Sequence, residues 1–460
     1  MDMPDWKEVL DETVQYAVRY LDNLPDRPVG STVTPAEMRA ALGGPLPDRP
    51  QEARAVIAAL AAAADPGVVA SSSGRFFGFV VGGATPAALA ADWLTSVWDQ
   101  NAGLYVLGPA AAVVEETAGA WLADLLGLPA GVSAGFVTGA QAANLTGLAI
   151  GLREVLGRAG WDVASAGLWG APRVRVLAGR GRHGTVDRAL RFLGAGTGAI
   201  VEVDMDDQGR MVPAALRAEL ERDSGPAIVC AQLGNVNSGA LDPIGEICDL
   251  ARPHGAWVHV DGAFGLWAAA SPRLRPLVAG VERADSWATD AHKWLNVPYD
   301  SGLVFCAHPD SHRATMGARA GYLMHGADGE RDALDYGPEH SRRARGFAVY
   351  AALRALGRDG VAALIDRCCA LATRFADQLS AAGGVDVLGD VVLNQVLVAF
   401  GGDERTRAVI DRVQRDGTCW MSGTTWNGRA AMRISVSNWS TTEPDVDRSV
   451  AAILRCARDI

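Results

Sequence analysis

The sequence predicts an α/β protein built around a mostly parallel, seven-stranded sheet with helices on its faces. Between residues 134 and 307, short apolar runs alternate with helical patterns, which is typical of such a sheet. The expected strands are 134–138, 173–178, 199–203, 227–233, 256–260, 286–289 and 302–307. The helical patterns that separate most of them lie at 140–156, 184–193, 213–223 and 244–251. Functional residues are expected at the carboxyl ends of the strands, where ligands bind to such sheets.

The regions outside the sheet predict two further parts. Residues 5–22 form an amphipathic helix, followed by a Pro/Gly-rich stretch (24–50) with little to bury, so this segment needs another surface to pack on. Long helices at 342–357 and 360–382, followed by two short strands around another helix, predict a smaller α+β lobe. The expected parts are an N-terminal helical segment (1–85) packing on a partner subunit, a large ligand-binding domain (86–340) and a small C-terminal domain (341–460).

Composition excludes several classes of function. The net charge is −11 and no Lys/Arg-rich run occurs, which argues against binding to nucleic acid or an anionic membrane. Seven cysteines without a CxxC pair, together with an acidic start that lacks a secretory pattern, predict a cytoplasmic protein. His308 and His312 have i, i+4 spacing, but Pro309 and the missing glutamate argue against a zinc helix, so no metal site is expected.

One lysine stands out. Of the 42 basic residues only Lys7 and Lys293 are lysines, and Lys293 lies between His292 and Trp294 just after an expected strand. Such surroundings disfavour the charged form of an amine, and a neutral amine can attack a carbonyl to form a Schiff base, which arginine cannot do. The alternative is an ordinary ion-pair partner. Lys293 is therefore a candidate covalent anchor for a carbonyl cofactor or substrate.

A candidate anion site lies in TGAQAANLTG, residues 138–147. The segment follows a strand and opens a helix, so free backbone N–H groups and the positive helix end face the edge of the sheet. Thr138, Gly139, Ala140 and Gln141 suit a phosphate monoester, although an ordinary helix cap is the alternative. No GK[ST] follows, so a nucleotide-binding loop is not expected.

Two more polar residues follow strands of the same sheet. Strand 256–260 delivers Asp261 to the carboxyl edge beside the small Ala263, and His183 stands between another strand and a helix. Taken alone, each residue could have a structural role, Asp261 as a helix cap and His183 as a histidine at the start of a helix. Pyridoxal 5′-phosphate needs all of these groups together. Lys293 would hold the aldehyde, Asp261 would pair with the pyridine nitrogen, and His183 and Ala263 would cover the two ring faces.

At this point the chain strongly resembles the group II pyridoxal-phosphate decarboxylases, the family of aromatic amino acid, glutamate and tyrosine decarboxylases. The likeness covers nearly the whole chain. Besides TGAQAANL, it rests on RFFGFVVGGATPAALAADWL, GPAAAVVEETAGAWLADLLGLP, GRHGTVDRAL, AQLGNVNSGALDPI, VDGAFG, ADSWATDAHKWLNVPYDSG and AMRISVSNWSTTEPDVD. The resemblance implies a fold type I enzyme that is a homodimer with its active site at the interface. It also implies that Lys293 forms the internal aldimine with the cofactor.

The resemblance further assigns roles around the cofactor. It places His292 close to the phosphate and Asn235, where a threonine is common, beside the 3′-hydroxyl. Asp290 stands where the family often has asparagine, and counts among the residues expected to bind the cofactor. Arg433 is a candidate for binding the substrate carboxylate. Tyr322 falls where the family's mobile loop carries a tyrosine that protonates the substrate α-carbon after CO₂ leaves.

Tyr322 bears on the type of reaction. Relatives with phenylalanine at that place tend to form aldehydes oxidatively, so the resemblance favours simple decarboxylation of an L-amino acid to its amine. The alternatives are another pyridoxal-phosphate reaction, such as transamination, carbon–carbon cleavage or aldehyde formation, and, more distantly, a non-catalytic cofactor-binding protein.

The substrate is harder to predict. Phe79, Asn101, Gly103 and Tyr105 are expected to contact it, the last three in a segment that aromatic decarboxylases supply from the neighbouring subunit. Asn101 and Gly103 are polar or small where those relatives have bulky apolar residues, which predicts a more open or more polar wall. Trp420 is a further candidate for the pocket, or else a core residue. An aromatic or other apolar L-amino acid is expected.

Overall fold

The computed structural model describes residues 6–318 and 330–460, and all seven expected strands are present in one sheet. They are β1 (Ser133–Val137), β2 (Arg175–Gly179), β3 (Ile200–Val203), β4 (Ala227–Gln232), β5 (Trp257–Asp261), β6 (Ser286–Asp290) and β7 (Gly302–Cys306). Their order is β1-β7-β6-β5-β4-β2-β3, and β7 is antiparallel to both of its neighbours while β2 to β6 are parallel. The predicted mostly parallel sheet is confirmed.

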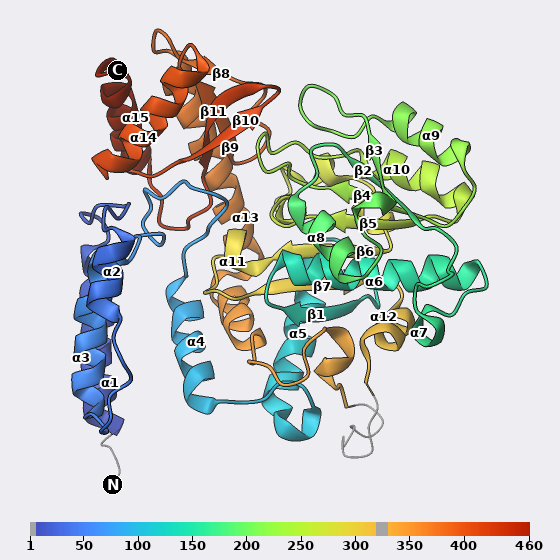
Figure 1. Cartoon of the computed structure of the whole chain (residues 1–460), viewed down its shortest axis with the longest axis horizontal. Coiled ribbons are helices and arrows are strands. Elements are labelled where there is room, and N and C mark those ends of the chain that lie inside the picture. Colours follow the sequence, from blue (N-terminus) through green and yellow to red (C-terminus); the bar gives the residue numbers. More distant parts are fainter. Residues whose placement is uncertain (1–5, 319–329) are drawn as a thin grey trace.

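Helices cover both faces of this sheet (Figure 1). They include α5 (Pro109–Leu125), α6 (Ala140–Arg158), α7 (Val163–Ala166), α8 (Gly184–Phe192), α9 (Pro213–Arg222), α10 (Ile244–Ala251), α11 (Ala291–Trp294) and α12 (Pro309–Met316). Helix α6 packs across β5, β6 and β7. Because side chains alternate along a strand, Trp257, His259 and Asp261 of β5 share one face, and Val258 and Val260 lie in the core on the other. Burial on both faces explains the unbroken apolar runs in the sequence.

The C-terminal part is an α+β lobe, as expected. It contains α13 (Gly346–Ser380), β8 (Asp386–Val387), β9 (Gln395–Ala399), α14 (Asp403–Asp416), β10 (Ser422–Trp426), β11 (Arg429–Ser435) and α15 (Glu443–Arg458). Its four strands are ordered β10-β11-β9-β8. The two long helices expected from the sequence are the two halves of α13, divided at Gly357, whose φ of 62° interrupts the helix.

The N-terminal segment contributes α1 (Trp6–Asn23), α2 (Pro35–Leu42), α3 (Ala53–Ala64) and α4 (Pro86–Trp98). Helices α1 to α3 lie together at one side of the molecule (Figure 1), and none of their residues is buried. The Pro/Gly-rich stretch 24–50 contains α2, which starts with a capping box between Thr34 and Glu37. None of the described helices combines the length and apolar character that a membrane span requires.

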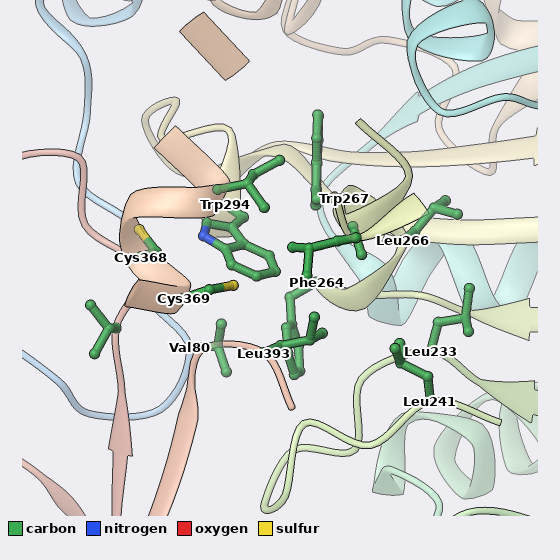
Figure 2. Close-up of a cluster of buried hydrophobic side chains, with 14 of the residues drawn as sticks. Val80, Leu233, Leu241, Phe264, Leu266, Trp267, Trp294, Cys368, Cys369 and Leu393 are labelled. Atoms are coloured by element: carbon green, nitrogen blue, oxygen red, sulfur yellow. The ribbon is translucent and has the colours of Figure 1, made fainter. Parts of the chain in front are cut away.

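A buried core joins the large domain to α13 behind α11. Figure 2 shows Trp294 flanked by Cys368 and Cys369 of α13, with Phe264 on its other side. The Trp294 side chain is fully buried and its ring centroid lies 6.2 Å from that of Phe264. Since Trp294 directly follows Lys293 in α11, this packing fixes the short helix that carries the lysine.

Candidate active site

Lys293 lies at the carboxyl edge of the sheet, three residues after the last residue of β6, Asp290. Its Nζ atom is 3.0 Å from Asp290 Oδ2, and 21% of the lysine side chain is exposed. The other carboxylate oxygen of Asp290 accepts a 2.6 Å hydrogen bond from the backbone N–H of Ala140. The sequence predicted a desolvated lysine. The structure instead gives Lys293 a buried carboxylate partner that ties it to the start of α6.

His292 flanks the same carboxylate. Its Nε2 atom lies 3.6 Å from Asp290 Oδ1, and its Nδ1 atom accepts a hydrogen bond of 3.2 Å from the Ser301 backbone N–H. Its ring stacks on Tyr299 at a centroid distance of 4.1 Å. Burial lowers the pKa of His292 below its ordinary value, with Asp290 opposing the shift. His292 therefore presents an Nε2–H donor toward the space beside Ala140 and Lys293.

The predicted phosphate cradle is the turn between β1 and α6. Gly139 is in extended backbone and packs against Gly302 of β7, where an added Cβ atom would lie 2.3 Å from the Gly139 Cα atom. Helix α6 starts at Ala140, and Thr138 is exposed while Gln141 donates to the Thr185 carbonyl at 3.3 Å. The positive end of α6 thus lies beside Lys293 and His292, which favours an anion there.

Asp261 ends β5 and is 4% exposed. Its Oδ2 atom accepts a 3.1 Å hydrogen bond from Asn144 of α6, and its Oδ1 atom accepts one of 3.3 Å from the Ala263 backbone N–H. The structure does not support the alternative of a simple helix cap, because the next helical turn starts at Gly265 after Phe264. The two hydrogen bonds therefore hold the carboxylate in place, and it does not cap a helix.

His183 has the structural role considered for it at the start of a helix, and its role beside the cofactor ring stays a prediction. It caps α8, because its Nδ1 atom accepts a 3.3 Å hydrogen bond from the Thr185 backbone N–H, while the residue remains exposed. Partial burial of the ring is the main cause that lowers its pKa. The charges of Lys293 and Arg433 add to the shift and Asp261 opposes it. Asp261, Lys293 and Arg433 are thus close enough to His183 for their charges to act on its imidazole.

Arg433 approaches the site from β11 of the C-terminal lobe. It is 8% exposed, and its Nη1 atom donates to the Val236 carbonyl at 3.3 Å. Within the described residues its Nε–H has no hydrogen-bond partner, and desolvation lowers its pKa. A buried guanidinium with an unused donor suits a carboxylate ligand.

Asn235 lies in the loop after β4 and is 1% exposed. Its amide group donates to Gln232 Oε1 at 3.2 Å, and its oxygen accepts from the Asn237 backbone N–H at 2.9 Å. These hydrogen bonds of Asn235 therefore stabilise the turn that follows β4. Its expected position beside the 3′-hydroxyl of the cofactor stays a prediction.

Asn296 is a residue that the sequence analysis missed. Its side-chain oxygen accepts hydrogen bonds from the backbone N–H groups of Gly83, at 2.7 Å, and Trp439, at 2.9 Å. Beside it, a Cβ atom at Gly82 would lie 2.0 Å from the Lys293 carbonyl oxygen. The segment before α4, the lysine loop and the C-terminal lobe thus meet at Asn296. Only its φ of 56°, a conformation that asparagine tolerates, distinguishes it locally.

Phe79 lies on the same segment before α4. It is 57% exposed, has a φ of 55°, and stacks on Trp420 with ring centroids 5.7 Å apart. Trp420 also stacks on Phe76, at 5.2 Å. Both phenylalanines of the stack lie on the same segment as Gly82, which follows Phe79 by three residues and packs against the Lys293 carbonyl.

The other substrate candidates lie in a different place. Apart from the bond that the Gly108 backbone N–H donates to the Tyr105 carbonyl, the described hydrogen bonds of Asn101, Gly103 and Tyr105 go to one another and to residues 332–342. They include Tyr105 N–H to Asp332 at 2.9 Å and Asn101 to Ser341 at 3.3 Å. These bonds join them to the chain that follows residue 329, and not to the Lys293 cluster.

A buried ion pair fixes that following segment. Glu115 of α5 is fully buried and binds Arg342 through two hydrogen bonds of 2.6 and 2.7 Å, with Arg331 3.7 Å away. Removing one partner of such a pair would cost about 3–5 kcal/mol, because it leaves a buried charge uncompensated. Tyr322, the expected loop tyrosine, lies outside the described residues.

Comparison with known proteins shows the family to which the chain belongs. Residues 35–401 match the pyridoxal-dependent decarboxylase conserved domain. The chain belongs to the pyridoxal-dependent decarboxylases. It is 25% identical to the aromatic-L-amino-acid decarboxylase of Bacillus atrophaeus, over 98% of this chain and 95% of that protein. It is 31% identical to the L-2,4-diaminobutyrate decarboxylase of Rhizobium meliloti (strain 1021), over 81% and 76% of the two chains.

Its fold is that of solved decarboxylases. A crystal structure of Oryza sativa TDC with PLP and tryptamine superimposes with a TM-score of 0.92 at 24% identity, over 98% of this chain and 97% of that one. The residues present fit the cofactor, pyridoxal 5′-phosphate. Lys293 offers the amine, the start of α6 an anion site and Asp261 a carboxylate. The protein is a pyridoxal-phosphate-dependent amino acid decarboxylase.

Proposed function

We propose that this decarboxylase converts an aromatic or other apolar L-amino acid into the corresponding amine and CO₂. The observation that carries the proposal is the aromatic stack of Phe76, Trp420 and the exposed Phe79, on the segment that packs against Lys293. Such a surface favours an apolar substrate side chain. The Bacillus relative, named for aromatic substrates, agrees with it, whereas the Rhizobium relative is named for a diamino acid.

Each residue of the site has a distinct task in this proposal. Bound pyridoxal phosphate supplies an electron-withdrawing ring that accepts the electron pair left when the carboxylate departs. Lys293 holds the cofactor covalently, and Asp261 keeps a negative charge at the ring nitrogen. His183 covers one ring face, and Arg433 binds the substrate carboxylate before cleavage. Tyr322 gives the proton to the α-carbon.

Mass spectrometry of the products tests the substrate. Purified, cofactor-loaded protein is incubated with a panel of L-amino acids that includes tryptophan, tyrosine, phenylalanine, leucine, glutamate and 2,4-diaminobutyrate, without any keto acid. We expect an amine equal to substrate minus CO₂ from one or more aromatic or apolar members. Amine from glutamate or diaminobutyrate alone would overturn the substrate class, and turnover that requires an added keto acid would favour transamination.

Replacing Tyr322 with phenylalanine tests the type of reaction. We expect Tyr322→Phe to divert product from amine to aldehyde, because the α-carbon loses its proton donor and is instead oxidised by dissolved O₂. The O₂ is reduced to hydrogen peroxide, and the nitrogen leaves as ammonia after hydrolysis. Amine, aldehyde and hydrogen peroxide are quantified from the same reaction. Tyr336→Phe, which removes a hydroxyl from a tyrosine of the described segment after residue 329, serves as the control. An unchanged amine yield in Tyr322→Phe would show that another residue delivers the proton.

We also propose that the protein is a homodimer. Along α1 the side chains of Trp6, Leu10, Val14, Val18 and Leu21 are 42–67% exposed, although they form the apolar face of the helix. A groove of about 970 Å³ lies between α1 and α4 and has a mainly apolar lining. An apolar face of this size on a helix with no buried residue needs a cover, and a second copy of the same segment is self-complementary to it.

A pair of substitutions on α1 tests this assembly. We expect Val14→Asp with Val18→Asp to weaken association by at least about 1.4 kcal/mol for each residue, roughly tenfold each, because a carboxylate would be buried in the contact. Light scattering after gel filtration gives the mass across a dilution series. Gln15→Asp adds a charge at an exposed polar position of the same helix and should leave the dimer intact. A monomeric wild-type protein would refute the proposal.

A further inference from the structure

A line of hydrogen-bonded, buried side chains runs from Trp257, the first residue of β5, to Asp261, its last residue. Trp257 Nε1 donates to Ser286 Oγ at 2.9 Å, Ser286 Oγ lies 2.8 Å from His259 Nδ1, and His259 Nε2 lies 2.9 Å from Asn144 Oδ1. All four side chains belong to fully buried residues. Water therefore does not compete for these atoms, and their hydrogen bonds go to other protein groups.

The direction of every hydrogen bond follows from the acceptor at its end. The Asp261 carboxylate can only accept, so the amide nitrogen of Asn144 faces Asp261 and its oxygen faces His259. His259 therefore carries its proton on Nε2, and its Nδ1 atom accepts from Ser286, whose oxygen accepts from the Trp257 indole. Burial lowers the pKa of His259 to about 3, which agrees with a neutral ring at neutral pH.

Asn144 is the branch point of this line. With its oxygen occupied by His259, its amide group donates both to Asp261 Oδ2, at 3.1 Å, and to Thr185 Oγ1, at 3.0 Å. Thr185 Oγ1 in turn lies 3.0 Å from His183 Nδ1, which also accepts from the Thr185 backbone N–H. Since Nδ1 is an acceptor in both contacts, the proton of neutral His183 lies on Nε2. The reverse orientation of Asn144 would place its oxygen against the Asp261 carboxylate.

We propose that Asn144, oriented by His259 and Ser286, is a positioning residue that fixes two groups of the active site together. It donates to the Asp261 carboxylate and so orients it. Together with the Thr185 backbone N–H, it directs the Thr185 hydroxyl hydrogen to His183 Nδ1, which leaves the proton of His183 on Nε2. The inference rests on the proposed function only for the tasks of Asp261 and His183. The hydrogen-bond order itself is a property of the fold.

Two glycines of α6 make room for this line. A Cβ atom on Gly147 would lie 2.4 Å from His259 Cε1, and one on Gly151 would lie 2.8 Å from Trp257 Cδ1. Glycine is a poor helix former, yet these two stand one turn apart on the face of α6 that meets β5. The close approach that they permit brings Asn144 within reach of His259.

The experiment uses the holoenzyme and two variants that break the line at different points. Asn144→Leu removes the branch, and Gly147→Ala pushes a methyl group against His259 without touching the active site. Gly157→Ala is the matched control, because its added Cβ meets no atom within 4 Å near the end of the same helix. The ¹⁵N chemical shifts of His183 give its tautomer, the visible spectrum of bound cofactor gives the state of its ring nitrogen, and steady-state kinetics follow turnover.

We expect His183 to be the Nε2–H tautomer in the wild type and a mixture of tautomers in both variants. The cofactor spectrum should shift toward the form with an unprotonated ring nitrogen, and kcat should fall by about 10- to 100-fold with a smaller change in KM. Gly157→Ala should match the wild type. A folded Asn144→Leu protein with unchanged His183 shifts and cofactor spectrum would refute the proposal, even if turnover fell. Absence of decarboxylation in every form would refute the proposed function alone, since both spectra need only bound cofactor.

Discussion

Replacing Lys293 with alanine is expected to abolish turnover and remove the visible absorbance of covalently held cofactor. The amine is the only group of the site able to form a Schiff base, and the other lysine of the chain, Lys7, lies on the exposed side of α1, paired with Asp11. Absorbance spectra and product mass spectrometry measure both effects. A Lys293→Ala protein that retained wild-type activity would exclude the covalent role.

The variant Lys293→Arg distinguishes the effect of the positive charge at this position from the effect of Schiff-base formation. Arginine keeps a cation near Asp290, which holds the lysine at 3.0 Å and also accepts from Ala140 at the start of α6. Because arginine stays charged, it cannot attack a carbonyl. We expect this variant to fold and to bind the phosphate of the cofactor reversibly while remaining inactive. Activity restored by arginine would mean that the ion pair matters and the covalent bond does not.

The second large effect is expected for Asp261→Asn. The change keeps the shape of the side chain but removes the charge that faces the cofactor ring, so the ring would lose much of its capacity to stabilise negative charge. We expect kcat to fall by about 10²–10³-fold, within the range found when one preorganised electrostatic group is removed. Steady-state kinetics measure the loss, and the cofactor spectrum shows whether binding persists.

Asp242→Asn is the matched control for that substitution. Asp242 is also buried, but its oxygens accept from the backbone N–H groups of Met211 and Gln232, away from Lys293. We expect this change to alter thermal stability and to leave the cofactor spectrum as it is. If both variants lost activity equally and kept the same spectrum, Asp261 would be acting on the fold and not on the ring.

Sequence patterns were sufficient for the elements whose signal is local. The strands are continuous apolar runs because helices bury both faces of the sheet, and Lys293 and Asp261 follow such runs directly. Helix α2 also had a local signal, the capping box of Thr34 and Glu37, which the Pro/Gly content of the stretch concealed.

The supporting residues could not be predicted in the same way. Asn296 acts on backbone more than 140 positions away along the chain, and Asn144 bonds to Asp261 across 117 positions. Such contacts depend on which helix covers which strand, and a single sequence does not specify this. Asp290, the ion-pair partner of Lys293, lies only three residues before it in the sequence. Its hydrogen bond to the backbone N–H of Ala140, however, depends on where the fold places the start of α6.

In the proposed dimer, the open face of α1 to α3 would make the thermal stability of the protein depend on its concentration. No residue of these helices is buried within one chain, so their packing against one another leaves apolar surface that the proposed second copy would cover. By mass action, dilution favours separated chains and lowers the melting temperature, and a more concentrated sample melts later. A cell that makes little of this enzyme would hold a larger share of it as chains with loosened N-terminal helices. Expression level would then set how much of the enzyme is protected from proteolysis as well as how much is made.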